Sequence, residues 1–186
     1  MRLVDHAVTG DPIGRAQTIG AQFDRTDLEP VARDFGIEFH HLPVTKDTKA
    51  AQEAVARRLL VEHAIDTVVL ARYMQILTPD FVAAYPNNII NIHHSFLPAF
   101  AGARPYHQAH ERGVKLIGAT AHYVTTDLDE GPIIEQDVVR VDHTMKPKEL
   151  ERLGQDVEST VLNRAVRWHA EHRVFENGHR TIVLRH

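Results

Sequence analysis

Cysteine is absent from this chain of 186 residues. Its absence excludes disulfide bonds, a catalytic thiolate and metal centres ligated by cysteine. Long apolar runs are missing too: no stretch approaches the roughly 20 residues that cross a bilayer, and the start at Met1–His6 has no apolar segment of signal-peptide length. We therefore expect a cytoplasmic protein with no membrane partner.

A strong excess of one charge is also missing. The formal net charge is −4 at pH 7, with acidic and basic residues mixed along the chain. No broad basic field is present to recruit a polyanion, so we expect no nucleic-acid partner. Repeats and flexible linkers are not found, and a length of 186 residues with 43% hydrophobic composition predicts one domain over residues 1–186. The oligomeric state, including a homo-oligomer, stays open.

Strand and helix patterns alternate along the chain. Strands are predicted at 18–23, 37–42, 67–71, 88–91, 114–124 and 132–139, and helices at 27–35, 48–64, 79–85, 105–112 and from about 150 to 168. A hairpin is predicted around Asn177-Gly178, a turn dipeptide between two short apolar stretches. The alternation predicts an α/β domain with a mostly parallel sheet, an antiparallel extension and a long C-terminal helix.

Two of these elements carry predictions about burial. Residues 67–71 form a continuous apolar run, as expected for a strand buried on both faces of a parallel sheet. In the helix at 48–64, apolar residues recur every fourth position, and Lys49, Glu53 and Arg57 are predicted to face outward. Both elements are therefore expected to contribute to the core of the sheet.

Three polar side chains with complementary chemistry follow predicted strands. Asn91 ends the strand at 88–91, and His93 lies two residues on, so both side chains point the same way if the extended geometry continues. Asp129 lies in a turn after a later strand, where Gly131 allows backbone conformations closed to other residues. Ligands in such sheets bind outside the carboxyl ends of the strands, and we expect the turn to lie beside His93.

An amide, an imidazole and a carboxylate are the groups needed to transfer or hydrolyse an acyl group. The amide N–H stabilises an oxyanion, the imidazole moves protons, and the carboxylate orients and charges the imidazole. Each residue also has a structural interpretation: Asn91 as a strand-end cap, His93 and His94 as polar loop residues, and Asp129 as an ordinary turn aspartate. Their joint occurrence favours the catalytic interpretation.

Fourteen histidines are an unusual feature of the composition. The pairs His107–His110 and His169–His172 are each three residues apart on predicted helices, and each pair would supply half of a metal site. No convergent carboxylate is evident near either pair. We therefore expect solvated helix faces there, and no metal.

Four segments resemble the folate-dependent formyltransferases and, within that group, the formyltetrahydrofolate deformylases. They are Ala71–Leu77, Ile92–Pro98, Gly102–Ala109 and Leu128–Ile134, and they agree with that group in order and spacing. The resemblance runs from about Asp27 to Leu184. It implies a doubly wound sheet, a variant of the Rossmann fold, and hydrolysis of 10-formyltetrahydrofolate to formate and tetrahydrofolate for one-carbon and purine metabolism. It implies no cofactor beyond the folate substrate.

The resemblance also implies roles for single residues. Asn91, His93 and Asp129 take the catalytic positions: water attacks the formyl carbon, Asn91 and protonated His93 hold the oxyanion, and Asp129 helps to place the water. The residues expected to bind substrate are Met74, Gln75, Ile76, Leu77, His94, His122, Thr125 and Asp127. Within this set, the main chain of residues 74–77 is expected to hold the pterin, and the turn that contains Thr125 and Asp127 to close over it.

Residues 1–20 depart from the deformylase pattern, since they match neither its small N-terminal regulatory domain nor its first strand and helix. The first strand of a doubly wound sheet is central. Either Arg2–Val8 substitutes for it, or the chain is a fragment or has a misassigned start. Two alternatives to deformylation stay open: a formyltransferase of the glycinamide ribonucleotide type, although Gly10–Gly14 is a poor phosphate loop, and a catalytically impaired folate-binding fragment.

Overall fold

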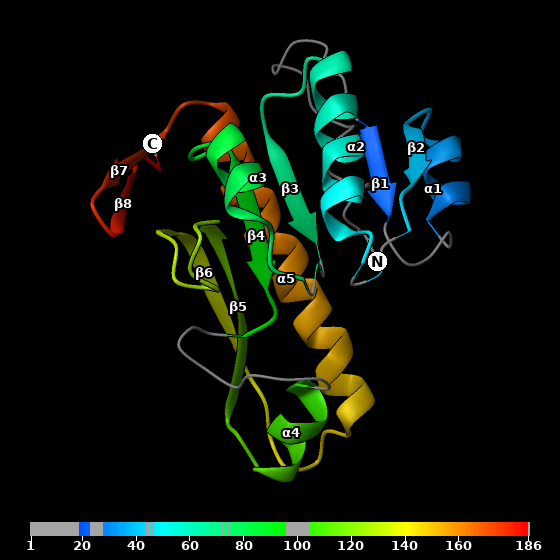
Figure 1. Cartoon of the computed structure of the whole chain (residues 1–186). Helices are drawn as coiled ribbons and strands as arrows, with labels where there is room; N and C mark the ends of the chain where they lie inside the picture. Colours follow the sequence, from blue (N-terminus) through cyan, green and yellow to red (C-terminus); the bar gives the residue numbers. More distant parts are fainter. Residues whose placement is uncertain are drawn as a thin grey trace.

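The computed structural model describes residues 19–22, 28–43, 45, 47–71, 73, 75–95 and 105–185. Within these residues the strands form three sheets (Figure 1). The strands are β1 (Ile19–Gln22) and β2 (Glu38–His41) in the first sheet, β3 (Val68–Ala71), β4 (Ile89–His93), β5 (Leu116–Tyr123) and β6 (Ile133–Arg140) in the second, and β7 (Val174–Asn177) and β8 (Arg180–Val183) in the third. No helix in the described ranges is long and apolar enough to span a membrane.

The second sheet has the order β3-β4-β5-β6 and contains both kinds of pairing. Strands β3 and β4 are parallel, as are β1 and β2, whereas β5 runs antiparallel to both β4 and β6. The helices are α1 (Glu29–Asp34), α2 (Lys49–Glu62), α3 (Pro79–Ala84), α4 (Pro105–Glu111) and α5 (Pro147–Ala170). The predicted α/β class, antiparallel extension and long C-terminal helix are confirmed, with the parallel pairs divided between two sheets.

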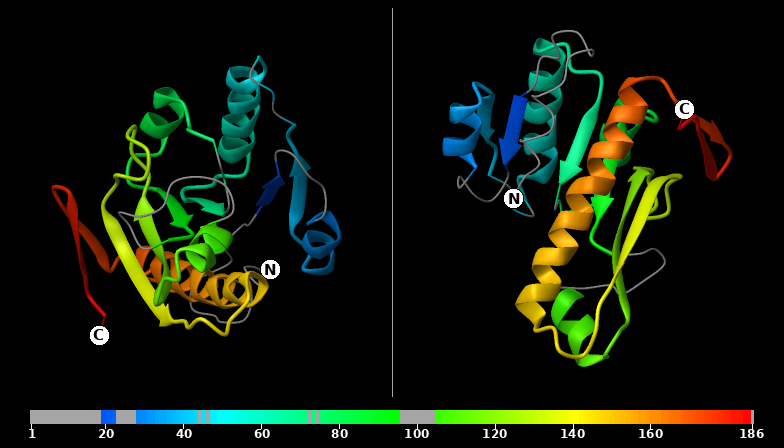
Figure 2. Two further views of the ribbon diagram at one scale, coloured as in Figure 1. Left: turned by 90° about the horizontal axis from the view of Figure 1, so that it is seen from below. Right: turned by 180° about the vertical axis from the view of Figure 1, so that it is seen from behind.

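Helix α5 covers one face of the four-stranded sheet, along which it runs in Figure 2. Its apolar residues recur every three or four positions, so Val161, Leu162 and Ala165 form one stripe. This stripe is buried against Ile90 of β4 and Ala121 of β5. The packing fixes β4 and β5, the two strands that carry the candidate site.

Helix α2 corrects one prediction, because Glu53 does not face solvent. The residue is 4% exposed, and the backbone N–H of Thr78 donates to the two oxygens of its carboxylate at 3.3 and 3.2 Å. The Thr78 hydroxyl also donates to this carboxylate and accepts a bond from the N–H of Phe81 in the first turn of α3. Glu53 is thus buried because it completes the N-terminal cap of a neighbouring helix.

Strand β3 corrects a second prediction, because it is not buried on both faces. Val68 and Leu70 pack with Leu60 of α2 on one face, whereas Val69 on the other is 41% exposed. Burial of both faces needs a covering layer on each, and Val69 is not fully covered. The sheet β1–β2 lies beyond β3 in both figures. The predictions for Arg2–Val8 and Gly10–Gly14 fall outside the described residues.

Candidate active site

The register between β4 and β5 places the first two polar groups of the site together. Asn91 lies opposite His122 across the antiparallel pair, and the Asn91 Nδ2 lies 3.3 Å from the His122 Nε2. The His122 Nδ1 lies 2.9 Å from the Tyr123 carbonyl oxygen, which can only accept a hydrogen bond. Nδ1 therefore carries the proton, and in neutral His122 the Nε2 accepts a bond from the amide of Asn91.

The turn after β5 brings in the carboxylate. Asp129 adopts a left-handed backbone with φ of 55°, a region that Asp tolerates better than most residues. The predicted conformational role of Gly131 is wrong, because its φ lies outside the left-handed region. Glycine is required there by packing: a Cβ at position 131 would lie 1.7 Å from the carbonyl oxygen of Tyr123.

Asp129 lies between two imidazoles. Its Oδ2 is 3.3 Å from the His93 Nδ1, and its Oδ1 is 3.6 Å from the His122 Nε2. The structure thus brings together Asn91, His93 and Asp129, and adds His122 as a fourth member. The ring of His94 stacks on that of His93, with centroids 4.9 Å apart and planes at 18°.

Burial sets the protonation of both imidazoles that face Asp129. Desolvation lowers the pKa of His93 from 6.5; the charge of Asp129 opposes this effect, and His94 and His122 reinforce it. Desolvation also lowers the pKa of His122, against the opposing effects of the Tyr123 carbonyl and Asp129. Both histidines are therefore neutral at pH 7.

Among the described residues, the Asn91 Oδ1 and the His93 Nε2 of the site are buried and have no hydrogen-bond partner. A buried polar atom without a partner costs about 1–3 kcal/mol, so native proteins keep few of them. If the proton of His93 lies on the Nδ1 that faces Asp129, the Nε2 carries a free lone pair. The site therefore offers an unoccupied base and an unoccupied amide oxygen to a ligand.

Sequence reasoning missed a polar row beside these residues. Thr120 lies opposite His93 in the β4–β5 register, on the same face as His122. Its hydroxyl donates to the Ser95 carbonyl oxygen at 3.0 Å and accepts from the Gln136 Nε2 at 2.9 Å. The signal was the alternation of Thr120 and His122 with small apolar residues in β5. The bond from Thr120 to Ser95 therefore fixes the backbone two residues after His93.

The predicted pterin-binding segment is divided between surface and core. Gln75 and Ile76 are exposed, whereas Leu77 is buried with Phe81 of α3. The Ile76 carbonyl accepts a hydrogen bond from the Lys49 Nζ. Met74 lies outside the described residues. Burial of Leu77 and the bond from Lys49 of α2 thus hold the segment in place, and the exposed Gln75 and Ile76 come directly before Leu77.

The other substrate-binding predictions lie in the turn that carries Asp129. The Thr125 hydroxyl donates to the carbonyl oxygen of Asp127 at 3.1 Å, a local bond that shapes the turn. The side chain of Asp127 is exposed, and that of Thr125 is partly buried. Both residues therefore lie on the segment that positions the carboxylate.

One of the predicted solvated histidines, His169, is not solvated, whereas His172 is exposed as predicted. The Nδ1 of His169 lies 2.8 Å from the Tyr123 hydroxyl, and its Nε2 lies 3.2 Å from the Thr67 hydroxyl. Both ring nitrogens are used in packing α5 against the sheet, so His169 has no nitrogen left for a metal. His107 and His110, in contrast, are exposed on α4, as predicted.

Comparison with known proteins identifies the family of this chain. A sequence model of the family described as formyl transferase matches residues 22–166. The chain belongs to the formyl transferase family. Among its relatives, formyltetrahydrofolate deformylase of Synechocystis is 62% identical over 158 residues, which cover 85% of this chain and 55% of the relative. The corresponding protein of Bacillus subtilis is 60% identical over 148 residues, or 80% of this chain and 49% of the relative.

Solved structures of formyl transferase family members share the fold. A formyltetrahydrofolate deformylase from Burkholderia mallei has a TM-score of 0.84 at 55% identity, over 90% of this chain and 59% of that one. A glycinamide ribonucleotide transformylase from Symbiobacterium toebii has a TM-score of 0.79 at 35% identity, over 90% of this chain and 80% of that one. The chain spans about half the length of the curated relatives it matches.

Proposed function

We propose that this member of the formyl transferase family hydrolyses 10-formyltetrahydrofolate to formate and tetrahydrofolate. The observation that carries the proposal is the 3.3 Å contact between the His93 Nδ1 and the Asp129 carboxylate, beside the amide of Asn91, with the His93 Nε2 buried and without a partner among the described residues. The names of relatives that are 52–62% identical support a deformylase in particular. The proposal includes no cofactor beyond the folate substrate.

In the first step, neutral His93 acts as a general base. Its Nδ1–H points to Asp129, and its Nε2 takes a proton from water as the water oxygen attacks the formyl carbon. The imidazolium formed in this step is stabilised by the carboxylate 3.3 Å away. The protonated His93 expected from the sequence therefore arises during attack, because burial keeps its pKa below 6.5 in the free protein.

The attack turns the formyl oxygen into an oxyanion. The amide nitrogen of Asn91 has two hydrogens, of which one is directed to the His122 Nε2. The second hydrogen is available to donate to the oxyanion, and this hydrogen bond strengthens as negative charge develops on the oxygen. His122 acts as a positioning residue, since its accepting nitrogen fixes which way the amide faces.

Collapse of the tetrahedral intermediate completes the reaction. The bond between the formyl carbon and the folate nitrogen breaks, the nitrogen takes a proton from His93, and formate and tetrahydrofolate leave. We place the pterin along the main chain of residues 74–77, before the anchor at Leu77. Thr125 and Asp127 close the site through the turn that carries Asp129.

The direct test is release of formate from 10-formyltetrahydrofolate by the purified chain. Tetrahydrofolate and formate in equal amounts, with no added amine, support the proposal. Turnover that appears only with glycinamide ribonucleotide would show a formyltransferase instead. Tight binding of a folate analogue without any formate would show a binding protein that has lost its reaction.

A further inference from the structure

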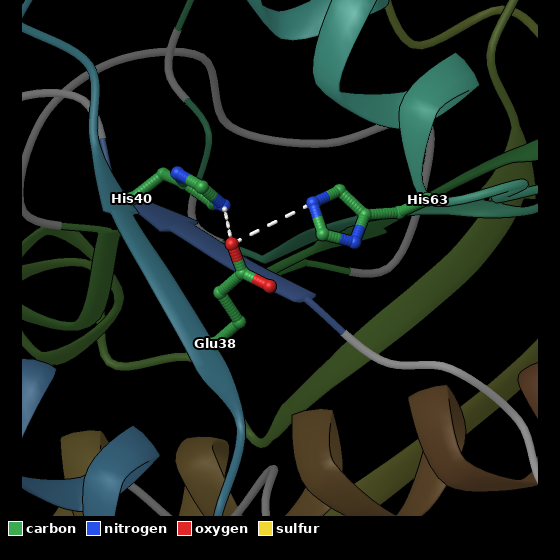
Figure 3. A group of neighbouring side chains, drawn as sticks. All are labelled: Glu38, His40 and His63. Atoms are coloured by element: carbon green, nitrogen blue, oxygen red, sulfur yellow. Dashed lines mark ion pairs between the residues drawn. The ribbon is translucent and has the colours of Figure 1, made fainter.

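Three side chains that no step of the proposed reaction uses meet between β2 and the end of α2 (Figure 3). Glu38 and His40 lie two residues apart in β2, so they share a face of the strand. His63 is the C-cap residue of α2, directly after Glu62. The Glu38 Oε1 lies 3.0 Å from the His40 Nε2 and 3.5 Å from the His63 Nε2.

These distances match the spacing of ligands around a small metal ion. Ligand bonds to tetrahedral zinc are about 2.0–2.2 Å for nitrogen and oxygen, so neighbouring ligand atoms lie about 3.3 Å apart. The two distances from Glu38, 3.0 and 3.5 Å, fall on either side of that value. One ligand atom from each of the three residues lies within 4.8 Å of the others, so small side-chain rotations complete the geometry.

We propose that Glu38, His40 and His63 bind one divalent transition-metal ion, with zinc as the best match. Two imidazoles and one carboxylate are a ligand set that zinc uses in proteins. The carboxylate supplies the negative charge that a dication requires. Water completes the fourth position, since Glu38 lies on the exposed side of the cluster.

The backbone at His63 favours a cation independently of the ligand geometry. The C-terminal end of a helix carries partial negative charge, which stabilises a positive ion within the last turn. The position of His63 is also fixed, because its N–H donates to the Leu59 carbonyl at 3.0 Å and Ile65 donates to Leu60 at 2.8 Å. Ala64, with φ of 51°, closes the helix directly after the ligand.

The site is separate from the proposed catalytic residues. Its strand ligands come from β2, in the sheet β1–β2, whereas Asn91 and His93 belong to β4 in the other sheet. Its ligands also come from two different elements, so the ion links β2 to α2. The role of the ion is to hold these two elements together, and its binding does not depend on the proposed reaction.

Titration of the untagged full chain with Co²⁺ after treatment with EDTA tests the proposal. We expect one ion per chain, with the visible absorption of tetrahedral cobalt, and its displacement by zinc. Zinc at 100 times its Kd should raise the Tm by about 5–10 °C for a domain of this size. Absence of saturable 1:1 binding, or binding without a rise in Tm, would overturn the inference.

The Co²⁺ affinity of variants at the three ligand positions tests whether the ion binds at these residues. Glu38→Gln removes the charged ligand from a half-exposed position and should fold as the unchanged protein does, with at least about tenfold weaker binding of Co²⁺. His63→Ala and His40→Ala should remove the 1:1 binding. The matched control is the double variant His107→Ala/His110→Ala, which deletes an exposed pair on α4 and should leave the affinity unchanged. Loss of binding in this control, with retention in Glu38→Gln and His63→Ala, would show an adventitious ion only.

Discussion

Replacing Asp129 by Asn tests the proposed catalytic site most directly. The carboxylate lies 3.3 Å from the His93 Nδ1 and 3.6 Å from the His122 Nε2, so the substitution removes one negative charge that faces two imidazoles. The side chain keeps its size, and the turn keeps a residue that tolerates a positive φ. Any loss of activity therefore reports on charge and hydrogen bonding rather than on the fold.

The expected loss follows from two effects. A hydrogen bond to a charged group contributes about 1.5–3 kcal/mol, and the imidazolium forms only during the reaction, so removing its partner lowers kcat by about 10- to 150-fold. In addition, an Asn amide that donates to the His93 Nδ1 would place the proton on Nε2 and block the base. Together we expect at least about a 100-fold fall in kcat and little change in KM.

The pH profile supplies a second readout for the same variant. Neutral His93 is the active form, so kcat/KM should rise with pH to a plateau, with a midpoint below 6.5 because burial lowers its pKa. Asp129 raises the pKa of His93, and its replacement by Asn should therefore move the midpoint to lower pH. The assay is release of formate from pH 5 to 8, with Tm measured for each protein.

Glu130→Gln is the matched control, since Glu130 is an exposed neighbouring carboxylate in the same turn. It should keep kcat and the midpoint of the unchanged protein. The reasoning fails if Asp129→Asn retains near-normal turnover, or if both variants lose activity equally. A midpoint that moves to higher pH in Asp129→Asn would also contradict the assigned role of the carboxylate.

Three further predictions address the substrate, the turn and stability. We propose that main-chain groups hold the pterin, so Gln75→Ala should change folate affinity little, whereas insertion of one residue after Gln75 should abolish binding. Equal Kd values for the two variants by calorimetry would refute this. Gly131→Ala should lower both Tm and kcat, because its Cβ would meet the Tyr123 carbonyl oxygen at 1.7 Å; a normal crystal structure and rate would contradict the packing argument. Burial lowers the folded-state pKa values of His93 and His122 below 6.5. The stability that depends on keeping these two buried histidines neutral is therefore fully present above pH 6.5 and is lost as the pH falls through the folded-state pKa. The urea midpoint should fall from pH 7 to pH 5, less steeply in His122→Gln, and a parallel fall in both proteins would refute the assignment.

Much of the fold could be predicted from the sequence because its elements have strong local signals. The helix expected from about 150 to 168 extends over Pro147–Ala170, and the strand expected at 88–91 extends over Ile89–His93. Apolar periodicity determines such elements without knowledge of their neighbours. The division of the parallel strands into two sheets depends on pairing between distant segments, which periodicity does not record.

The errors at single residues have the same origin. Glu53 lies on the polar side of α2 by periodicity, yet the N-terminal end of α3 buries it through hydrogen bonds to Thr78. Gly131 was correctly singled out, but the reason for glycine is the carbonyl of Tyr123, which local sequence does not reveal. The meeting of Glu38, His40 and His63 likewise depends on how α2 lies against β2. In each case the decisive contact joins two elements.

The position of Glu53 has a consequence for the way substrate affinity can be altered. The first half of α2 holds both ends of a short stretch of chain, since Lys49 bonds to the Ile76 carbonyl and Glu53 bonds to Thr78. The stretch in between cannot shift without breaking a contact to this helix. With the pterin in its proposed position, substitutions of Lys49 or Glu53 should therefore weaken folate binding from outside the site.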